Sequence, residues 1–147
     1  ALILYVVELQ IPNPIPIPGA KLGLANIVTV YAVYRYRPGE VLMVVLIRIF
    51  LGSLFGGSMI TFLYSLAGSL LCLFGMLILR CIVSGHAIWL ASVLGAVLHN
   101  TGQMLVAVAI AGTGMLFYLP FLMTAGCIAG AFTGLCAQLV LNRLGRR

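Results

Sequence analysis

Acidic side chains are nearly absent from this chain, because its 147 residues include only two, Glu8 and Glu40. Paired carboxylates for general acid–base catalysis, or for holding Mg²⁺ against a diphosphate, cannot be built from two isolated glutamates. The phosphate-binding loop GxxxxGK[ST] and the hydrolase motif GxSxG are also missing. We therefore predict that the protein is not an enzyme and uses no cofactor.

Zinc and disulfide patterns are missing as well. The four cysteines, Cys72, Cys81, Cys127 and Cys136, stand alone rather than in CxxC pairs. Buried, inert thiols are the expected state, with a redox pair as the alternative. His99 has no second His or Cys at ligand spacing, so we predict no metal site.

Apolar residues, by contrast, make up 63% of the chain, and the mean hydropathy is +1.23. A soluble domain of this size needs a largely polar surface and could not bury so many apolar side chains. The composition predicts an all-α integral membrane protein with the lipid bilayer as its surroundings. The basic residues are dispersed at the borders of apolar runs, so nucleic acid is not an expected partner.

Breakers and charges divide the chain, as a single membrane domain over 1–147, into six apolar segments. We expect helices over 1–11, 22–36, 40–54, 58–79, 87–111 and 120–141. The last three are long enough to cross about 30 Å of hydrocarbon, whereas the second and third, near 15 residues, are short. The chain starts inside an apolar run without an initiator Met, which predicts a truncated first helix.

Residues 12–20 form a proline-rich loop with prolines at four alternate positions, Pro12, Pro14, Pro16 and Pro18. Each proline fixes φ and removes a backbone donor, so this segment is expected to be a stiff, extended strap.

The cations predict the topology. Six of the eight follow the second, fourth or sixth segment: Arg35, Arg37, Arg80, Arg143, Arg146 and Arg147. By the positive-inside rule, both termini then face the cytoplasm and the proline-rich loop faces outward. We expect a multi-pass protein of the bacterial cytoplasmic membrane.

Small residues recur every four positions on the last two segments, at Gly126, Gly130 and Gly134 and at Ala87, Ala91 and Gly95. This spacing lets helix backbones approach closely. It predicts packing within the bundle, with a docking surface for a partner as the alternative.

Polar residues on the fifth segment form a stripe. Gly95, His99 and Gln103 are four residues apart and share one helix face, with Asn100 beside them. Because polar groups inside a bilayer are costly, the stripe must face protein or water. It is either an interhelical clamp or a ligand-binding face, and we list His99, Asn100 and Gln103 as candidate substrate-binding residues.

Three further residues are candidates for the same site. Arg48 lies about 12 Å along the third helix from Glu40 and needs a partner, either an ion pair with Glu8 or a bound anion. Lys21 begins the second segment, where it either binds an anion with the helix N-terminus or snorkels to the interface. Asn26 either bonds to another helix or lines the pocket. Together these residues suit a small ligand with an anionic group and an apolar body.

Three motifs carry a resemblance to a known family. P-I-P-I-P-G-A-K-L-G-L-A-N-I (14–27), G-A-V-L-H-N-T-G-Q (95–103) and Y-L-P (118–120) resemble the bacterial Gx transporter family. That family, often labelled heptaprenyl diphosphate synthase component I, is similar to the S-components of energy-coupling-factor transporters.

The resemblance implies a six-transmembrane-helix bundle that binds a micronutrient near the outer face, in a pocket built from the strap and helices four to six. It also implies two kinds of protein partner, a transmembrane coupling subunit and ATPase subunits. The synthase label is at odds with the absent D-D-x-x-D motif. The rival hypothesis is a non-catalytic accessory subunit in prenyl diphosphate or quinone metabolism, or in flavin-linked electron export.

Overall fold

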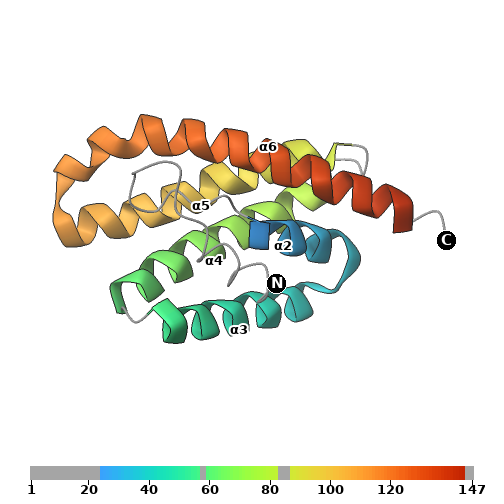
Figure 1. Cartoon of the computed structure of the whole chain (residues 1–147), viewed down its shortest axis with the longest axis horizontal. Helices are drawn as coiled ribbons and strands as arrows, with labels where there is room; N and C mark the ends of the chain where they lie inside the picture. Colours follow the sequence, from blue (N-terminus) through green and yellow to red (C-terminus); the bar gives the residue numbers. More distant parts are fainter. Residues whose placement is uncertain (1–23, 57–58, 83–86, 145–147) are drawn as a thin grey trace.

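The computed structural model describes residues 24–56, 59–82 and 87–144, and the regular structure in these ranges is entirely helical (Figure 1). The elements are α2 (Leu24–Arg35), α3 (Pro38–Gly56), α4 (Met59–Ile82), α5 (Ile88–Ala111), the 3₁₀ helix η1 (Thr113–Tyr118) and α6 (Leu119–Leu144). The all-α class is thereby confirmed for the described ranges. The predicted first helix (1–11) and proline-rich loop (12–20) lie outside them, so six crossings stay a prediction.

Helix α3 is longer than the predicted 40–54. It begins at Pro38, a residue suited to the first helical position, and the Glu40 carboxylate accepts the Arg37 backbone N–H at 3.0 Å. This bond from the third helical residue is half of a capping box. The helix then continues past the predicted end at residue 54 to Gly56. Its 19 residues span about 28 Å.

Helix α4 also extends beyond its predicted end at residue 79. Arg80 does not close the helix but lies in its last turn, which runs on to Ile82. Its Nη1 donates to the carbonyl oxygens of Val33 at 2.7 Å and Tyr36 at 3.1 Å. Arg80 therefore caps the C-terminus of α2, where carbonyls lack helical partners and a cation is favoured.

The predicted loop between the fifth and sixth segments is mostly helical. Gly112, with φ of 88°, interrupts the chain at the end of α5, and η1 leads directly into α6. Glycine is suited to this positive φ because it carries no Cβ. Helix α6 begins at Leu119 and ends at Leu144, three residues past the predicted 120–141.

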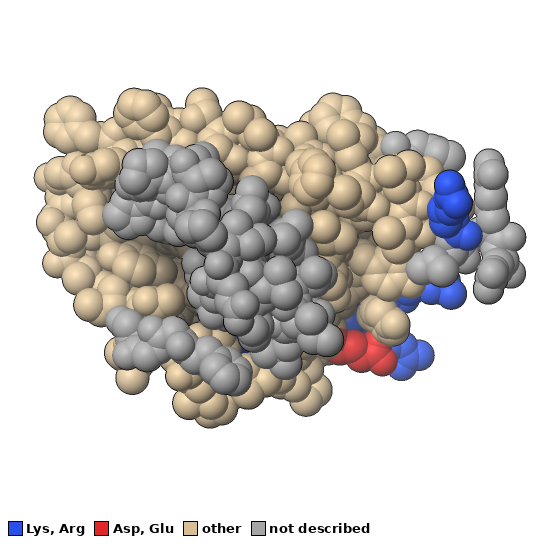
Figure 2. Space-filling model, viewed as in Figure 1, with Lys and Arg blue, Asp and Glu red and all other residues tan. Residues whose placement is uncertain are grey.

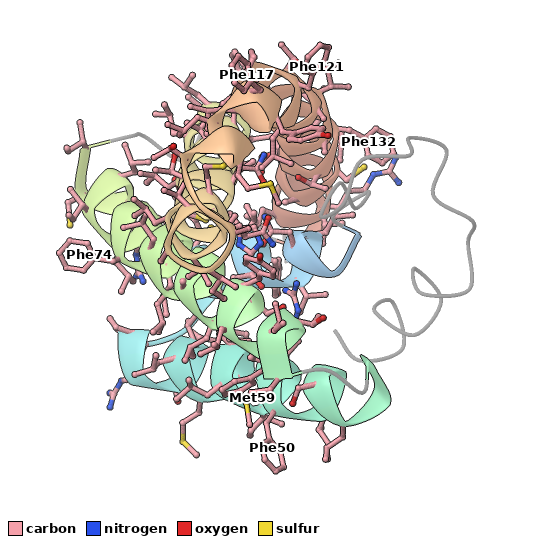
Figure 3. All side chains as sticks on the ribbon, turned by 90° about the vertical axis from the view of Figure 1, so that its left-hand side faces the viewer. Phe50, Met59, Phe74, Phe117, Phe121 and Phe132 are labelled. Carbon is pink, nitrogen blue, oxygen red and sulfur yellow. The ribbon has the colours of Figure 1, made fainter. Side chains whose placement is uncertain are left out.

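Four long helices follow one another in alternating directions, with α3 on α4, α4 on α5 and α5 on α6 (Figure 1). The short α2 packs against α6, α4 and α3 near the middle of the bundle, as the end-on view in Figure 3 shows. It supplies fully buried core residues, Val30 and Val33, which meet Val41 of α3 and Met76 of α4. Helices α2, α3 and α4 thus supply most of the core residues.

Large apolar side chains cover the outside of the bundle. Phe74, Phe117 and Phe121 are 65%, 83% and 62% exposed and point away from it in Figure 3. Three helical stretches are long and apolar enough to cross a membrane: Met59–Ile82, Ile88–Ala111 and Thr113–Arg143. An apolar exterior around apolar helices is the arrangement of a protein solvated by lipid. The protein is membrane-embedded.

The described cations gather at one end of the bundle, with Arg48 as the exception (Figure 2). The last turns of α2, α4 and α6 carry Arg35, Arg80 and Arg143, and Arg37 precedes α3. The alternating directions of the helices bring these positions together. This is the asymmetry that the positive-inside prediction requires, while the side of the membrane stays a prediction.

The glycines of α6 pack against α5, as their spacing predicts. A Cβ on Gly134 would lie 2.6 Å from Cα of Trp89, and one on Gly130 would lie 2.9 Å from Cα of Val93. Both distances are far below ordinary contact, so only glycine permits this approach of the two backbones. The packing prediction is confirmed, and the glycine face is not available to a partner.

We predict that Gly134→Ala destabilises the folded protein by about 1–3 kcal/mol, because its methyl group meets α5 backbone that cannot move independently. The measurement is thermal unfolding of the purified protein in mild detergent. Gly39→Ala is the matched control, since a Cβ there meets nothing within 4 Å. Equal unfolding temperatures for the two variants would contradict the packing.

Candidate functional site

Arg48 lies on the inward face of α3. The helix buries a stripe of residues spaced by four, Val41, Val45 and Ile49, and Arg48 is half-buried beside it. Its Nη1 donates to Oγ1 of Thr29 on α2 at 3.1 Å, and Thr29 is only 6% exposed. The guanidinium is therefore directed into the bundle rather than toward lipid. Its predicted ion-pair partner, Glu8, lies outside the described residues.

Helix α4 connects Arg48 to the polar stripe of α5. Cys72 of α4 is buried and lies within electrostatic range of Arg48. Its Sγ would be 3.3 Å from a Cβ on Gly95, one helical turn before His99. Cys72 thus lies against the α5 face that bears His99, within electrostatic range of Arg48.

His99 and Gln103 pack over a glycine of the same α4 face. A Cβ on Gly68 would lie 3.1 Å from Cε1 of His99 and 2.9 Å from Cγ of Gln103. Both side chains are half-buried and directed at α4, not at lipid. Gly68 is one turn before Cys72, so His99, Gln103 and Gly95 of α5 border consecutive turns of α4. We call Thr29, Arg48, His99 and Gln103 the polar site.

Asn100 faces a different neighbour. Its side chain is 8% exposed, and Nδ2 donates to the Leu122 carbonyl oxygen of α6 at 2.6 Å. This is the bond expected from the clamp alternative. Whether Asn100 also binds substrate stays a prediction.

The Asn100 bond belongs to a row of hydrogen bonds between α5 and α6 that sequence reasoning missed. The Ser92 and Thr133 hydroxyls lie 3.2 Å apart, and Oε1 of Gln138 accepts the backbone N–H of Ile88 at 2.9 Å. The signal was present in the sequence, because Thr133 and Gln138 lie among or next to the glycines that mark this face.

Two predicted site residues remain, Asn26 and Lys21. Asn26 is half-buried on α2, one turn before Thr29, and so belongs to the helix that orients Arg48. Lys21 lies outside the described residues. Within the described ranges, no three His, Cys, Asp or Glu side chains come together in a way that could hold a metal ion.

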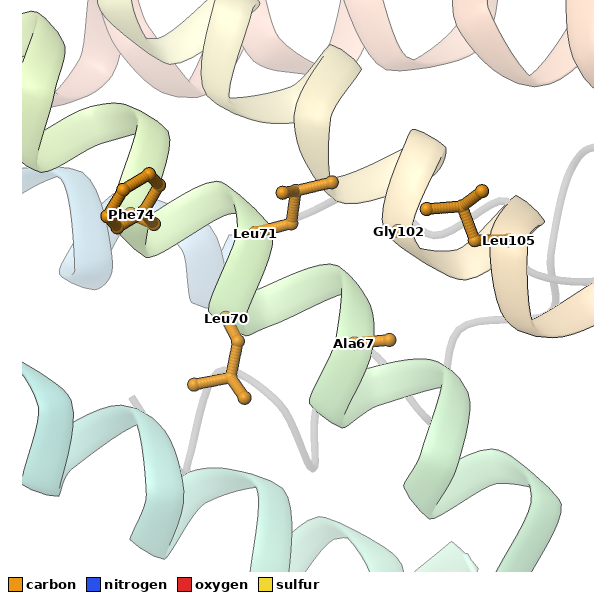
Figure 4. Close-up of a pocket in the computed structure, with 6 residues that line it drawn as sticks. All are labelled: Ala67, Leu70, Leu71, Phe74, Gly102 and Leu105. Atoms are coloured by element: carbon orange, nitrogen blue, oxygen red, sulfur yellow. The ribbon is translucent and has the colours of Figure 1, made fainter.

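A groove on the outer flank of the α4–α5 crossing is separate from the polar site (Figure 4). It has a volume of about 350 Å³ and is lined by Ala67, Leu70, Leu71, Phe74, Gly102 and Leu105. At Gly102 the backbones of α4 and α5 meet, since a Cβ there would lie 2.7 Å from the Ala67 carbonyl oxygen. The groove is apolar and open to the outside, with Phe74 and Leu105 65% and 64% exposed.

Replacing Asn100 tests the clamp. Asn100→Ala should lower the free energy of unfolding by about 1–2 kcal/mol, because it removes a buried hydrogen bond and leaves a cavity beside Leu122. Thr101→Val is the control, since the Thr101 hydroxyl bonds only to the Val97 carbonyl of its own helix. Unfolding in detergent, followed by circular dichroism, gives the comparison. An unaltered Asn100→Ala midpoint would refute the clamp.

Comparison with known proteins finds one matching family model. The model of the family described as heptaprenyl diphosphate synthase component I matches residues 1–140, nearly the whole chain. No curated protein and no solved structure matches it. Because the match covers far more than half of the sequence, and because the apolar helical bundle shows a membrane protein, the chain belongs to the heptaprenyl diphosphate synthase component I family.

Proposed function

We propose that the protein is the membrane-embedded substrate-binding subunit of an energy-coupling-factor-type importer, and that it captures a small anionic or amphipathic micronutrient at the outer face. The observation that carries this proposal is the inward direction of Arg48, a cation in the middle of α3 bound to Thr29. Charged side chains within membrane helices are costly and typically mark binding sites or pathways.

The polar site offers complementary chemistry to such a ligand. The guanidinium of Arg48 can bind a carboxylate or phosphate through charge-assisted hydrogen bonds. His99 and Gln103 on the neighbouring face of α5 supply further polar atoms, while the core around them is apolar. A ligand with an anionic group and an apolar body would use both kinds of surface.

The distribution of acids favours binding over catalysis. Glu40, the one acid in the described ranges, caps α3 at the arginine-rich end and takes no part in the polar site. The sequence also lacks a phosphate-binding loop. Energy for transport would therefore come from separate subunits, a transmembrane coupling protein and ATPases.

A second candidate is an accessory subunit in prenyl diphosphate metabolism, and the family description favours it. An isoprenoid diphosphate is also an anion with an apolar body, so the polar site fits it as well. In that case the chain would present or retain the lipid substrate for a soluble catalytic partner.

Ligand retention tests the binding site. We predict that a small anionic molecule stays bound after extraction in mild detergent and is detected by mass spectrometry. Arg48→Gln should lower its occupancy by about 10–100-fold, because one charge-assisted contact is lost. Arg35→Gln, an exposed change at the end of α2, is the control and should retain the molecule. Equal retention in both variants, with both folded, would refute the site.

Co-purification separates the two candidates. Recovery of a coupling subunit with ATPases supports the importer, whereas recovery of a soluble Asp-rich prenyl synthase supports the accessory subunit. Arg48→Gln should leave either association intact, because Arg48 lies inside the bundle.

A further inference from the structure

The arginine-rich end of the bundle is a second site of concentrated charge. We define it by the exposed arginines Arg35, Arg37, Arg80 and Arg143. The helices that bear three of them are neighbours, because α2 packs against both α4 and α6. Figure 2 shows basic residues gathered there, with an acidic residue beside them.

Helix capping accounts for part of this cluster. Arg35, Arg80 and Arg143 lie in the last turns of α2, α4 and α6, where a cation offsets the negative end of the helix dipole. Arg80 also donates hydrogen bonds to carbonyl oxygens at the end of the neighbouring helix α2, those of Val33 and Tyr36.

Capping does not account for Arg37. This residue directly precedes α3, at the positive end of a helix, where a cation is unfavourable. The Glu40 carboxylate accepts its backbone N–H, and the Arg37 side chain is exposed. The exposed guanidinium is therefore accessible to an anion from outside the chain.

The side chains around the cluster indicate the depth at which it lies. Trp89, in the first turn of α5, and Tyr36, just after α2, are 42% and 51% exposed. Tryptophan and tyrosine concentrate at the membrane–water interface. Ile82 and Leu139 nearby are 73% and 65% exposed and offer apolar surface to acyl chains. The guanidinium groups therefore lie at the level of lipid headgroups.

We propose that this end of the bundle binds the phosphate headgroup of an anionic phospholipid, through Arg35, Arg37 and Arg143. The occupant is a lipid rather than an acidic protein, because interfacial aromatic residues and exposed aliphatic side chains flank the charges. Each arginine near a membrane surface strengthens the attraction to anionic lipid about fivefold. The proposal is independent of the ligand of the polar site.

The single tryptophan of the chain, Trp89, reports on lipids at this end. We expect brominated phosphatidylglycerol in mixed vesicles with phosphatidylcholine to quench Trp89 fluorescence more strongly than brominated phosphatidylcholine at the same mole fraction. In the triple variant Arg35→Gln, Arg37→Gln, Arg143→Gln, the relative affinity for phosphatidylglycerol should fall at least about tenfold. Arg80 is left unchanged because it caps α2.

The matched control replaces the same three arginines by lysine, which keeps the charge and should keep most of the preference. Raising the salt concentration to about 1 M should weaken the preference of the unaltered protein, because exposed charges are then screened. Unchanged selectivity in a folded glutamine variant would overturn the proposal. Equal quenching by the two lipids in the unaltered protein would also overturn it. That result would favour an acidic protein as the partner of the arginine cluster.

Discussion

Close backbone contact on both sides of α5 determines the architecture. Gly68 and Gly102 bring α4 against one side of this helix, and Gly130 and Gly134 bring α6 against the other. In lipid, helices gain little from burying apolar surface against one another, so close packing and hydrogen bonds must supply the association. Because α5 is fixed between its neighbours, the direction of each of its polar side chains is fixed too.

Adjacent polar residues of α5 consequently contact different helices. His99 lies over Gly68 of α4, whereas Asn100 is rotated by about 100° and bonds to Leu122 of α6. The helix face that bears His99 and Gln103 packs against Gly68 of α4. The proposed binding site and the interhelical clamp therefore lie within a single turn and use different side chains.

Composition and spacing predicted what depends on local physics: the membrane class, the existence of the described helices and the glycine contacts of α6. Helix ends were predicted less well, because features such as the Glu40 carboxylate, which caps α3 at Pro38, are not marked by hydropathy. The direction of Asn100 and the role of Arg80 depend on which helices are neighbours. A single sequence carries only weak signals of that arrangement, such as the polar residues among the α6 glycines.

Two arginines from neighbouring helices bind α2. The described part of this helix, Leu24–Arg35, is about 18 Å long and supplies Val30, Ala32 and Val33 to the core. Arg80 binds the carbonyls of its last turn, and Arg48 binds Thr29 about one turn earlier. Cations from two different helices thus position α2, and α2 in turn orients the guanidinium of the polar site. Any movement of α2 would have to break the Arg48 bond to Thr29 and the Arg80 bond to Val33. The position of the Arg48 guanidinium therefore depends on the arginine-rich end as well as on its own surroundings.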